Sequence, residues 1–431
     1  DHRDLHLSIR RQRQMCIRDR STPCFAETTV TPEVGFVFNT LLFLMGGFLV
    51  MWMAAGFCML ESGLVTSKSV SVICAKNIGL YAIAGIMFWV VGYNLAYGIP
   101  EGGFIGNFNY WSDASKLETG YADSSDWFFQ MVFCATTASI VSGTMAERVK
   151  LWPFFLFTAI LTGIIYPIQM GWQWGGGWLA AIGFSDFAGS TLVHSCGGAA
   201  ALAGVILLGP RLGRFKNGSV KPMKPFAASS IPLATLGVFI LWMGWFGFNG
   251  GSQLALGTLD DSISVSKIFV NTNLAACGGV MTNAVLTRLL YGRTDVIHML
   301  NGAIAGLVAI TAEPLTPSPF VAILIGGVGG VVAVFGTQLL YKFKIDDVVG
   351  AIPAHLFAGI WGTLAVPITN NAVAFSSQLI GIVSINIFVF VVSFIAWFVM
   401  KQTIGIRLSA KAEKQGTDIS EVGVVAYAIR D

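Results

Sequence analysis

Residues 186–194 read DFAGSTLVH and residues 347–355 read DVVGAIPAH, so the chain carries the pattern Asp-x7-His twice. Each histidine, His194 and His355, lies in apolar sequence rich in glycine and alanine and is followed four residues later by another glycine. The whole chain has only five histidines. Because an ionisable side chain is costly inside a membrane, the repeated pattern indicates a pathway that handles protons or cations.

The composition of the chain is that of a membrane protein. Of its 431 residues, 54% are hydrophobic and 11% are charged, whereas soluble domains carry about 25% charged residues. Apolar runs of about 20 residues, the length that crosses a bilayer as a helix, recur throughout the chain. The seven cysteines have irregular spacing that fits neither a disulfide nor a zinc framework. We therefore expect an all-α polytopic membrane protein with no soluble domain and no nucleic-acid partner.

The apolar runs predict eleven transmembrane helices. After residue 20, every Lys and Arg except Lys116 and Lys267 falls on one side of this arrangement. Because the positively charged side of a membrane protein faces the cytoplasm, we expect the C-terminus inside and the N-terminus outside a cell inner (plasma) membrane. The expected helices span residues 36–60, 73–97, 126–146, 151–171, 187–208, 226–249, 264–289, 295–312, 319–341, 347–367 and 375–400.

The basic loop at residues 209–225 divides the first ten helices into two groups of five. Since five is odd, the second group must run through the membrane in the opposite sense, which is the inverted-topology repeat of many transporters. We expect the repeat halves at about 36–208 and 226–367, and one extra C-terminal helix at 375–400.

The two ends of the chain are set apart from the transmembrane domain, which we place at residues 26–400. Residues 1–25 include an Arg-rich run that is unlike anything downstream, and Cys24-Phe25-Ala26 has the form of the end of a cleaved signal peptide. We interpret 1–25 as a sequence artefact or a signal remnant. Residues 401–431 are expected to form a cytoplasmic tail.

The repeated pattern makes a geometric prediction about the histidines. Asp186 and Asp347 fall where the fifth and tenth helices begin, so each is a candidate helix N-cap. Eight residues at 1.5 Å each place the histidine about 12 Å deeper, near the middle of a ~30 Å hydrocarbon core. Because the two helices enter from opposite faces, His194 and His355 can meet there.

The residues alone leave three roles open for this pair. A hydrogen-bonded imidazole pair can shuttle a proton or pass a small polar solute, or it can be purely structural. A metal site is the third, although zinc sites usually have three or four protein ligands and only Cys196 lies nearby as a further ligand. The remaining internal histidine, His298, is expected at the inner end of the eighth helix in a structural or vestibule role.

Aromatic segments gather at the expected outer surface. Trp172–Trp178 contains three consecutive glycines, which let a backbone and an indole approach a ligand closely. Phe129–Phe133 and Trp245–Ser252 are expected on the same side. The outer loop at 98–125, with Asp126 at its end, is acidic and attracts cations, which an aromatic face can bind. The alternative for the tryptophans is an interfacial aromatic belt.

Five stretches that occur in order across residues 30–415 resemble the Amt/Mep ammonium transporters, which are relatives of the Rh glycoproteins. So many motifs in one order make a chance match implausible. The stretches are MWMAAGFCMLESGLVTSKS (51–69), GTMAERVK (143–150), WGGGWLAAIGFSDFAGSTLVHSCGG (174–198), WMGWFGFNGGS (242–252) and IDDVVGAIPAHLFAGIWG (345–362).

The resemblance implies roles for residues at the outer mouth. The outer cation site would consist of Trp174, Phe133 and Ser252. The presence of this tryptophan and serine favours the Amt branch over the Rh branch. A stacked phenyl gate would consist of Phe133 and Phe248, with Phe129 behind the first ring.

Deeper in the protein, the resemblance implies that Trp245 lines the vestibule beside the gate and that Asp186 is a buried aspartate required for transport. His194 and His355 would be the twin pore histidines. Ammonium would lose its proton near Asp186 and the gate, and ammonia would cross while the proton travels separately. Potassium has a similar size and charge but no proton to give up, so this route would exclude it.

The resemblance also implies a homotrimer that transports ammonium and methylammonium, is not an enzyme, and uses no cofactor or metal. A PII-type signalling protein would bind at the inner face and the regulatory tail. Thr417 and residues 422–424 depart from the family's tail pattern, and Gly350 replaces an aspartate of some members. The alternatives are an ammonium sensor or transceptor, a neutral gas channel of the Rh type, and a metalloenzyme built on the histidines.

Overall fold

The computed structural model of the chain describes residues 30–216, 219–220 and 226–427. The segment interpreted as an artefact or signal remnant, 1–25, lies outside the described residues, as does the end of the tail from 428. Nine helical segments of the described chain are long and apolar enough to cross a membrane. They are α2 (Pro32–Leu64), α3 to α4 (Val70–Tyr97), α6 to α7 (Leu151–Gly171), η4 to α9 (Ser190–Leu208), α10 (Ile231–Gly251), α11 (Leu259–Tyr291), α13 (Pro319–Lys342), η6 to α14 (Ile352–Thr369) and α15 (Phe375–Thr403).

Two further helices lie at expected spans. The helix α12 (Val296–Ile310) is apolar but has only 15 residues. The helix α5 (Asp123–Thr144) has two aspartates in its first turn and several serines and threonines, which lower its hydropathy. The all-helical membrane class is therefore confirmed, with nine to eleven apolar helices.

Four membrane segments contain a turn of π-helix, a distortion that often marks functional positions. These turns are η1 (Phe88–Gly92), η3 (Leu161–Ile165), η4 (Ser190–Ser195) and η6 (Ile352–Phe357). The last two contain His194 and His355. The short elements are η2 (Leu117–Thr119), α8 (Trp178–Ala181), the antiparallel pair β1 (Phe215–Lys216) and β2 (Ser219–Val220), α16 (Ala410–Gln415) and η7 (Asp418–Val422).

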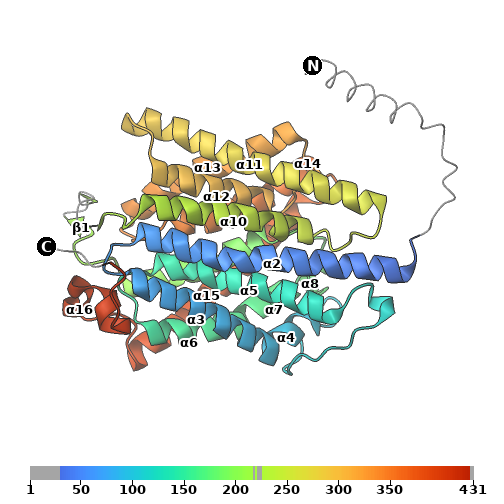
Figure 1. Cartoon of the computed structure of the whole chain (residues 1–431), viewed down its shortest axis with the longest axis horizontal. Helices are drawn as coiled ribbons and strands as arrows, with labels where there is room; N and C mark the ends of the chain where they lie inside the picture. Colours follow the sequence, from blue (N-terminus) through green and yellow to red (C-terminus); the bar gives the residue numbers. More distant parts are fainter. Residues whose placement is uncertain (1–29, 217–218, 221–225, 428–431) are drawn as a thin grey trace, which may run out of the picture.

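The helices form a bundle with two distinct ends. Figure 1 shows β1 and α16 at one end, which we call the tail end, and α8 at the opposite side of the bundle. The long connection at 98–122 lies at that opposite end, where the side chain of Asn39 in the first half of α2 donates to the carbonyl of Gly120 at 3.0 Å. We call this the loop end.

Glycines bring the backbones of α2 and α10 into close contact. A Cβ added at Gly56 would lie 3.1 Å from the carbonyl oxygen of Gly237, and one at Gly247 would lie 2.6 Å from that of Gly46. Figure 1 shows the two helices side by side along most of their length. Small residues permit this approach in lipid, where packing rather than hydrophobicity holds helices together. The contact fixes the rotation of α10, the helix that carries Trp245 and the residues after it.

Buried ion pairs connect separate segments of the chain at the tail end. Arg211 contacts Glu147 at 2.5 Å and Asp346 at 2.8 Å, and all three side chains are buried. Burial alone would raise the pKa of the Asp346 carboxyl, but Arg211 beside it holds this pKa well below its usual value. In the tail, Asp418 accepts from the backbone N–H of Val70 at 3.0 Å. This bond holds the segment of the tail around Asp418 against the start of α3.

Candidate functional site

A cavity of about 570 Å³ opens at the loop end. Phe129, Phe133, Trp174 and Ser252, which the sequence placed at one pore mouth, all line it. They come from α5, from the turn after α7, and from the end of α10. Segments far apart in the chain therefore meet in one aromatic chamber.

Local interactions orient the polar groups of this cavity. The indole Nε1 of Trp174 donates to the carbonyl of Asp186 at 2.9 Å. This bond holds the indole in the cavity wall, and Gly176 in the same turn adopts a φ of +77° that favours glycine. The hydroxyl of Ser252 donates to the carbonyl of Phe248 at 2.8 Å. Its oxygen therefore keeps lone pairs with which to accept from a cation.

Asp126 is a feature that the sequence placed only in a general acidic rim. The structure buries this side chain, 5% exposed, in the wall of the loop-end cavity. Its carboxylate accepts from the hydroxyl of Tyr93 at 2.6 Å and from Gln130 at 3.1 Å. Tyr93 and Tyr97, one helical turn apart, line the same cavity. The four-residue spacing of these two tyrosines, at the end of the second expected span, was the sequence signal that could have predicted their place in the cavity wall.

Two stacked phenyl rings close the floor of the cavity. The ring centroids of Phe133 and Phe248 are 3.9 Å apart, with an interplanar angle of 22°. Phe129 lies behind Phe133 at 4.7 Å, and all three side chains are buried. The rings leave no space between them for a hydrated ion.

Trp245 lies beside the phenyl pair, with its ring 5.9 Å from Phe248, and not in the vestibule wall. It is fully buried and does not line the loop-end cavity. Its ring stacks on His194 at 4.9 Å and 22°, and its Nε1 donates to Thr311 at 2.8 Å. The close glycine contact between α2 and α10 turns this face of α10 inward, so the indole packs beneath the phenyl pair.

The two histidines meet inside the bundle, as their spacing predicted. The Nδ1 atoms of His194 and His355 are 3.2 Å apart, and both side chains are buried. Only one Nδ1 can carry the shared proton in the neutral pair. The Nε2 of His194 is buried without a hydrogen-bond partner among the described residues. The His194 ring lies 5.2 Å from Phe248, so the pair continues the line of the phenyl rings.

Both aspartates of the repeated pattern cap the π-helical turns. Asp186 is fully buried, and its two oxygens accept from the backbone N–H groups of four successive residues, 189–192, at 2.7 to 3.0 Å. Asp347 accepts from Gly350 at 3.0 Å and from Ile352 at 2.7 Å. The expected capping role is confirmed for both. Four backbone donors already contact the two oxygens of Asp186, so a donor from a solute in the cavity would have to compete with them.

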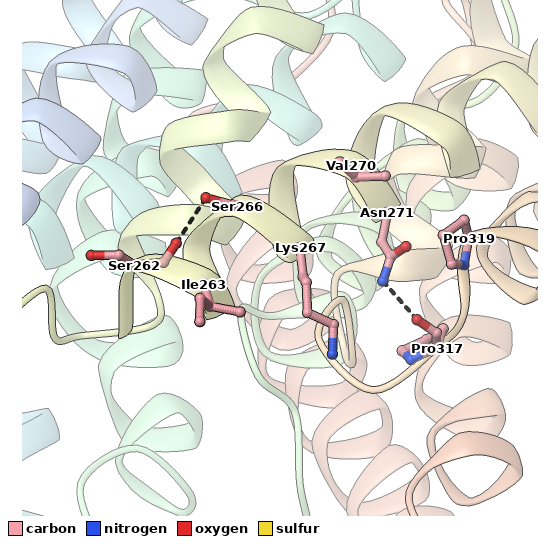
Figure 2. Close-up of a pocket in the computed structure, with 8 residues that line it drawn as sticks. All are labelled: Ser262, Ile263, Ser266, Lys267, Val270, Asn271, Pro317 and Pro319. Carbon is pink, nitrogen blue, oxygen red and sulfur yellow. Dashed lines mark hydrogen bonds between the residues drawn. The ribbon is translucent and has the colours of Figure 1, made fainter. Parts of the chain in front are cut away.

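Two other cavities of the described chain lie apart from the line of aromatic rings and histidines. No group of three or more His, Cys, Asp or Glu suited to a metal occurs within it. A cavity of about 430 Å³ lies on the flank of α11, lined by Lys267 and Asn271 among others (Figure 2), but none of its lining residues belongs to the aromatic and histidine line. His298 lies 3.2 Å from Asp295 and lines a cavity with Arg211 and Arg214. It is thus separate from the histidine pair.

The fold and this site define a membrane transport protein with an aromatic chamber leading to a buried imidazole pair. The model of the ammonium transporter family matches residues 41–427. The chain is 39% identical over 411 residues to ammonium transporter Amt2 of Archaeoglobus fulgidus, covering 88% of this chain and 86% of the relative. It is 35% identical over 394 residues to ammonium transporter Amt2 of Methanocaldococcus jannaschii, covering 88% and 89%.

Solved structures agree with these relatives. A protein described as a sensor Amt protein superposes with a TM-score of 0.85 at 32% identity, covering 91% of this chain and all of the other. Mep2 of Candida albicans superposes with a TM-score of 0.79 at 26% identity, covering 91% of each chain. The chain belongs to the ammonium transporter family.

Proposed function

We propose that this protein transports ammonium electrogenically, by separating it into ammonia and a proton. One observation carries the proposal: an unbroken line of rings runs from the loop-end cavity to the histidine pair. Phe133 stacks on Phe248, Phe248 lies 5.2 Å from His194, and His194 lies 5.3 Å from His355. This line suits a small neutral solute and is hostile to a hydrated cation.

Recognition of the cation would take place in the loop-end cavity. The faces of Trp174 and Phe133 and the Ser252 oxygen provide cation–π contacts and one acceptor. The carboxylate of Asp126, in the wall of the same cavity, adds negative charge and attracts cations. Ammonium would lose part of its water here without losing its charge.

Selectivity would follow at the phenyl pair. Carrying a charge through an apolar gap is costly, and ammonium avoids that cost by giving up a proton, which potassium cannot do. Asp186 would act from beneath Trp174 by holding η4 and its histidine in place and by supplying negative charge, not as the proton acceptor. Ammonia would then pass along His194 and His355, which can donate and accept hydrogen bonds in turn.

The architecture that we propose has eleven membrane crossings, with five in each inverted repeat and α15 as the extra helix. The capped π-helical turns η4 and η6, which each carry one histidine, support the repeat. The basic residues at the tail end support a cytoplasmic tail and an N-terminus outside a plasma membrane. We also propose a homotrimer and a PII-type partner at the tail end, on the family resemblance.

Current measurements on purified protein in proteoliposomes would test transport. We expect an ammonium-dependent current and no potassium current. A neutral gas channel of the Rh type would move ammonia without current, and a sensor would bind ammonium with little flux. The sensor alternative draws its support from one structural neighbour, the sensor Amt protein. A potassium current equal to the ammonium current would refute the selectivity mechanism.

A further inference from the structure

Glu61 is a buried carboxylate that the transport mechanism above does not use. It lies near the tail end of α2 and is 1% exposed. Ionisable groups at membrane depth are costly and are usually functional. The sequence quoted it within a family stretch but assigned it no role.

One oxygen of this carboxylate is held and the other is free. The Oε2 atom accepts from the hydroxyl of Ser142 at 2.7 Å and from Asn77 at 3.4 Å. The Oε1 atom is buried without any hydrogen-bond partner among the described residues. An unsatisfied buried acceptor costs about 1–3 kcal/mol, so a solute that donates to Oε1 would be bound favourably.

Glu61 lines the same small cavity as His355, the second histidine of the pair. Glu61, His355, Phe57 and Asn301 line this cavity, whose volume is about 10 Å³. That volume is the lower limit for one water-sized molecule, and ammonium is of similar size. The phenyl ring of Phe57 lies 6.2 Å from His355, so the cavity continues the line of rings toward the tail end.

A buried lysine balances the charge without occupying the free oxygen. Lys76 is 1% exposed, and its Nζ donates to the carbonyl of Ser142 at 2.6 Å. It also lies 4.6 Å from the centroid of the Phe154 ring. Glu61 itself forms no ion pair among the described residues. Ser142 thus contacts both the Glu61 carboxylate and the Lys76 ammonium group. The Oε1 atom of Glu61 remains available to accept a hydrogen bond.

We propose that Glu61 is a second ammonium-binding group, located at the tail-end mouth of the pore, where ammonium re-forms after passing His355. This inference rests on the proposed function, which delivers ammonia and a proton to this end. The nitrogen lone pair takes the proton that was released at the loop end: the bond between this proton and its last carrier breaks as one N–H bond forms, and the single positive charge is restored on nitrogen. The new ammonium then donates an N–H to Oε1 before it leaves.

The test compares transport from the two ends of the full-length protein. Right-side-out and inside-out membrane vesicles present the loop end or the tail end to radiolabelled methylammonium. We expect Glu61→Gln to raise the tail-end KM by about tenfold or more, the effect of losing one hydrogen bond to a charged group, while the loop-end KM stays within about twofold. The matched control is Glu33→Gln, which removes an exposed carboxylate from the opposite end of the same helix and should change neither KM.

The outcomes separate this inference from the proposed function. A tail-end KM unchanged in Glu61→Gln, or an equal rise at both ends, overturns the role of Glu61 alone. Absence of uptake by the unmutated protein in both vesicle types overturns transport and the inference with it. If Glu61→Gln does not insert, Glu61→Asp keeps the charge but withdraws the oxygen by one methylene. It should then raise the tail-end KM alone, and an unchanged value overturns the proposal.

Discussion

Replacing Asp186 by alanine should abolish transport and destabilise the protein, whereas the same change at Asp347 should leave transport largely intact. The two residues occupy equivalent places in the repeated pattern. They differ in their surroundings: Asp186 lies beneath the loop-end cavity with Trp174 bonded to its carbonyl. Asp347 caps η6 and directly follows Asp346, which pairs with Arg211 at the tail end. The pair therefore serves as a variant and its matched control.

The hydrogen bonds set the magnitude of each effect. Asp186→Ala removes the acceptor of four buried N–H groups, and at about 1 kcal/mol each, the lower end for a buried unsatisfied donor, the loss is about 4 kcal/mol. Asp347→Ala removes two side-chain acceptor contacts and so costs about 2 kcal/mol. Asp347 is 7% exposed, so water can reach its donors and reduce that cost further.

Thermal unfolding in detergent and flux in proteoliposomes would measure the two effects. At roughly 2 °C per kcal/mol, the Tm should fall by about 8 °C for Asp186→Ala and about 4 °C for Asp347→Ala. Flux per folded protein should be absent in the first variant and at least about half of normal in the second. Equal losses of Tm, or full flux in Asp186→Ala, would refute the reasoning.

Three further changes test other parts of the structure. Phe133→Leu keeps an apolar, though smaller, side chain but removes a cation–π face worth about 0.5–2 kcal/mol, so the KM for ammonium at the loop end should rise by about 2- to 30-fold. An unchanged KM would remove Phe133 from the cation site. Asp346→Asn should destabilise the protein by about 3 kcal/mol, because Arg211 loses a buried partner. The pKa of Asp346 is held below its unfolded value of about 3.9, so this stabilisation is fully present above about pH 4 and disappears as the pH falls further. The Tm gap between variant and unmutated protein should therefore persist at pH 5 and close only in stronger acid, and a gap that closes near pH 6 would contradict this assignment. Oxidation with diamide should join Cys58 to Cys74, whose sulfur atoms are 3.9 Å apart, and peptide mass spectrometry showing both thiols free would contradict the packing of α2 on α3.

Hydropathy placed the helices well because lipid offers no partner for backbone polar groups, so each crossing segment must satisfy its own as a helix. A helix lies at each expected span, from α2 to α15. Two of these helices do not meet the criteria for a membrane span: α5 is not apolar enough and α12 is too short. Hydropathy did not predict the π-helical turns, because it reports only how apolar a segment is. Two of these turns, η4 and η6, carry the histidines, and the other two, η1 and η3, lie in segments without one.

For the site, the resemblance named residues that the structure brings together. It also implied that Trp245 lines the vestibule, whereas the structure places this ring beside Phe248 and outside the cavity wall. Asp126 and Glu61 illustrate what spacing cannot reveal. In the sequence, one was part of a generally acidic rim and the other a polar residue inside an apolar run. Whether a carboxylate oxygen is held or free depends on the residues opposite it, here Tyr93 and Ser142, which come from other helices.

The sequence by itself determined that this is a helical membrane protein and that two aspartates begin the segments that carry two deep histidines. These properties depend on composition and on spacing along one helix, where the rise per residue is constant. Only the tertiary structure decided that the Nδ1 atoms meet at 3.2 Å and that one oxygen of Glu61 has no hydrogen-bond partner in the part of the chain that the structure describes. Such contacts depend on how each helix is rotated and tilted against its neighbours, which the close glycine contacts between helices set.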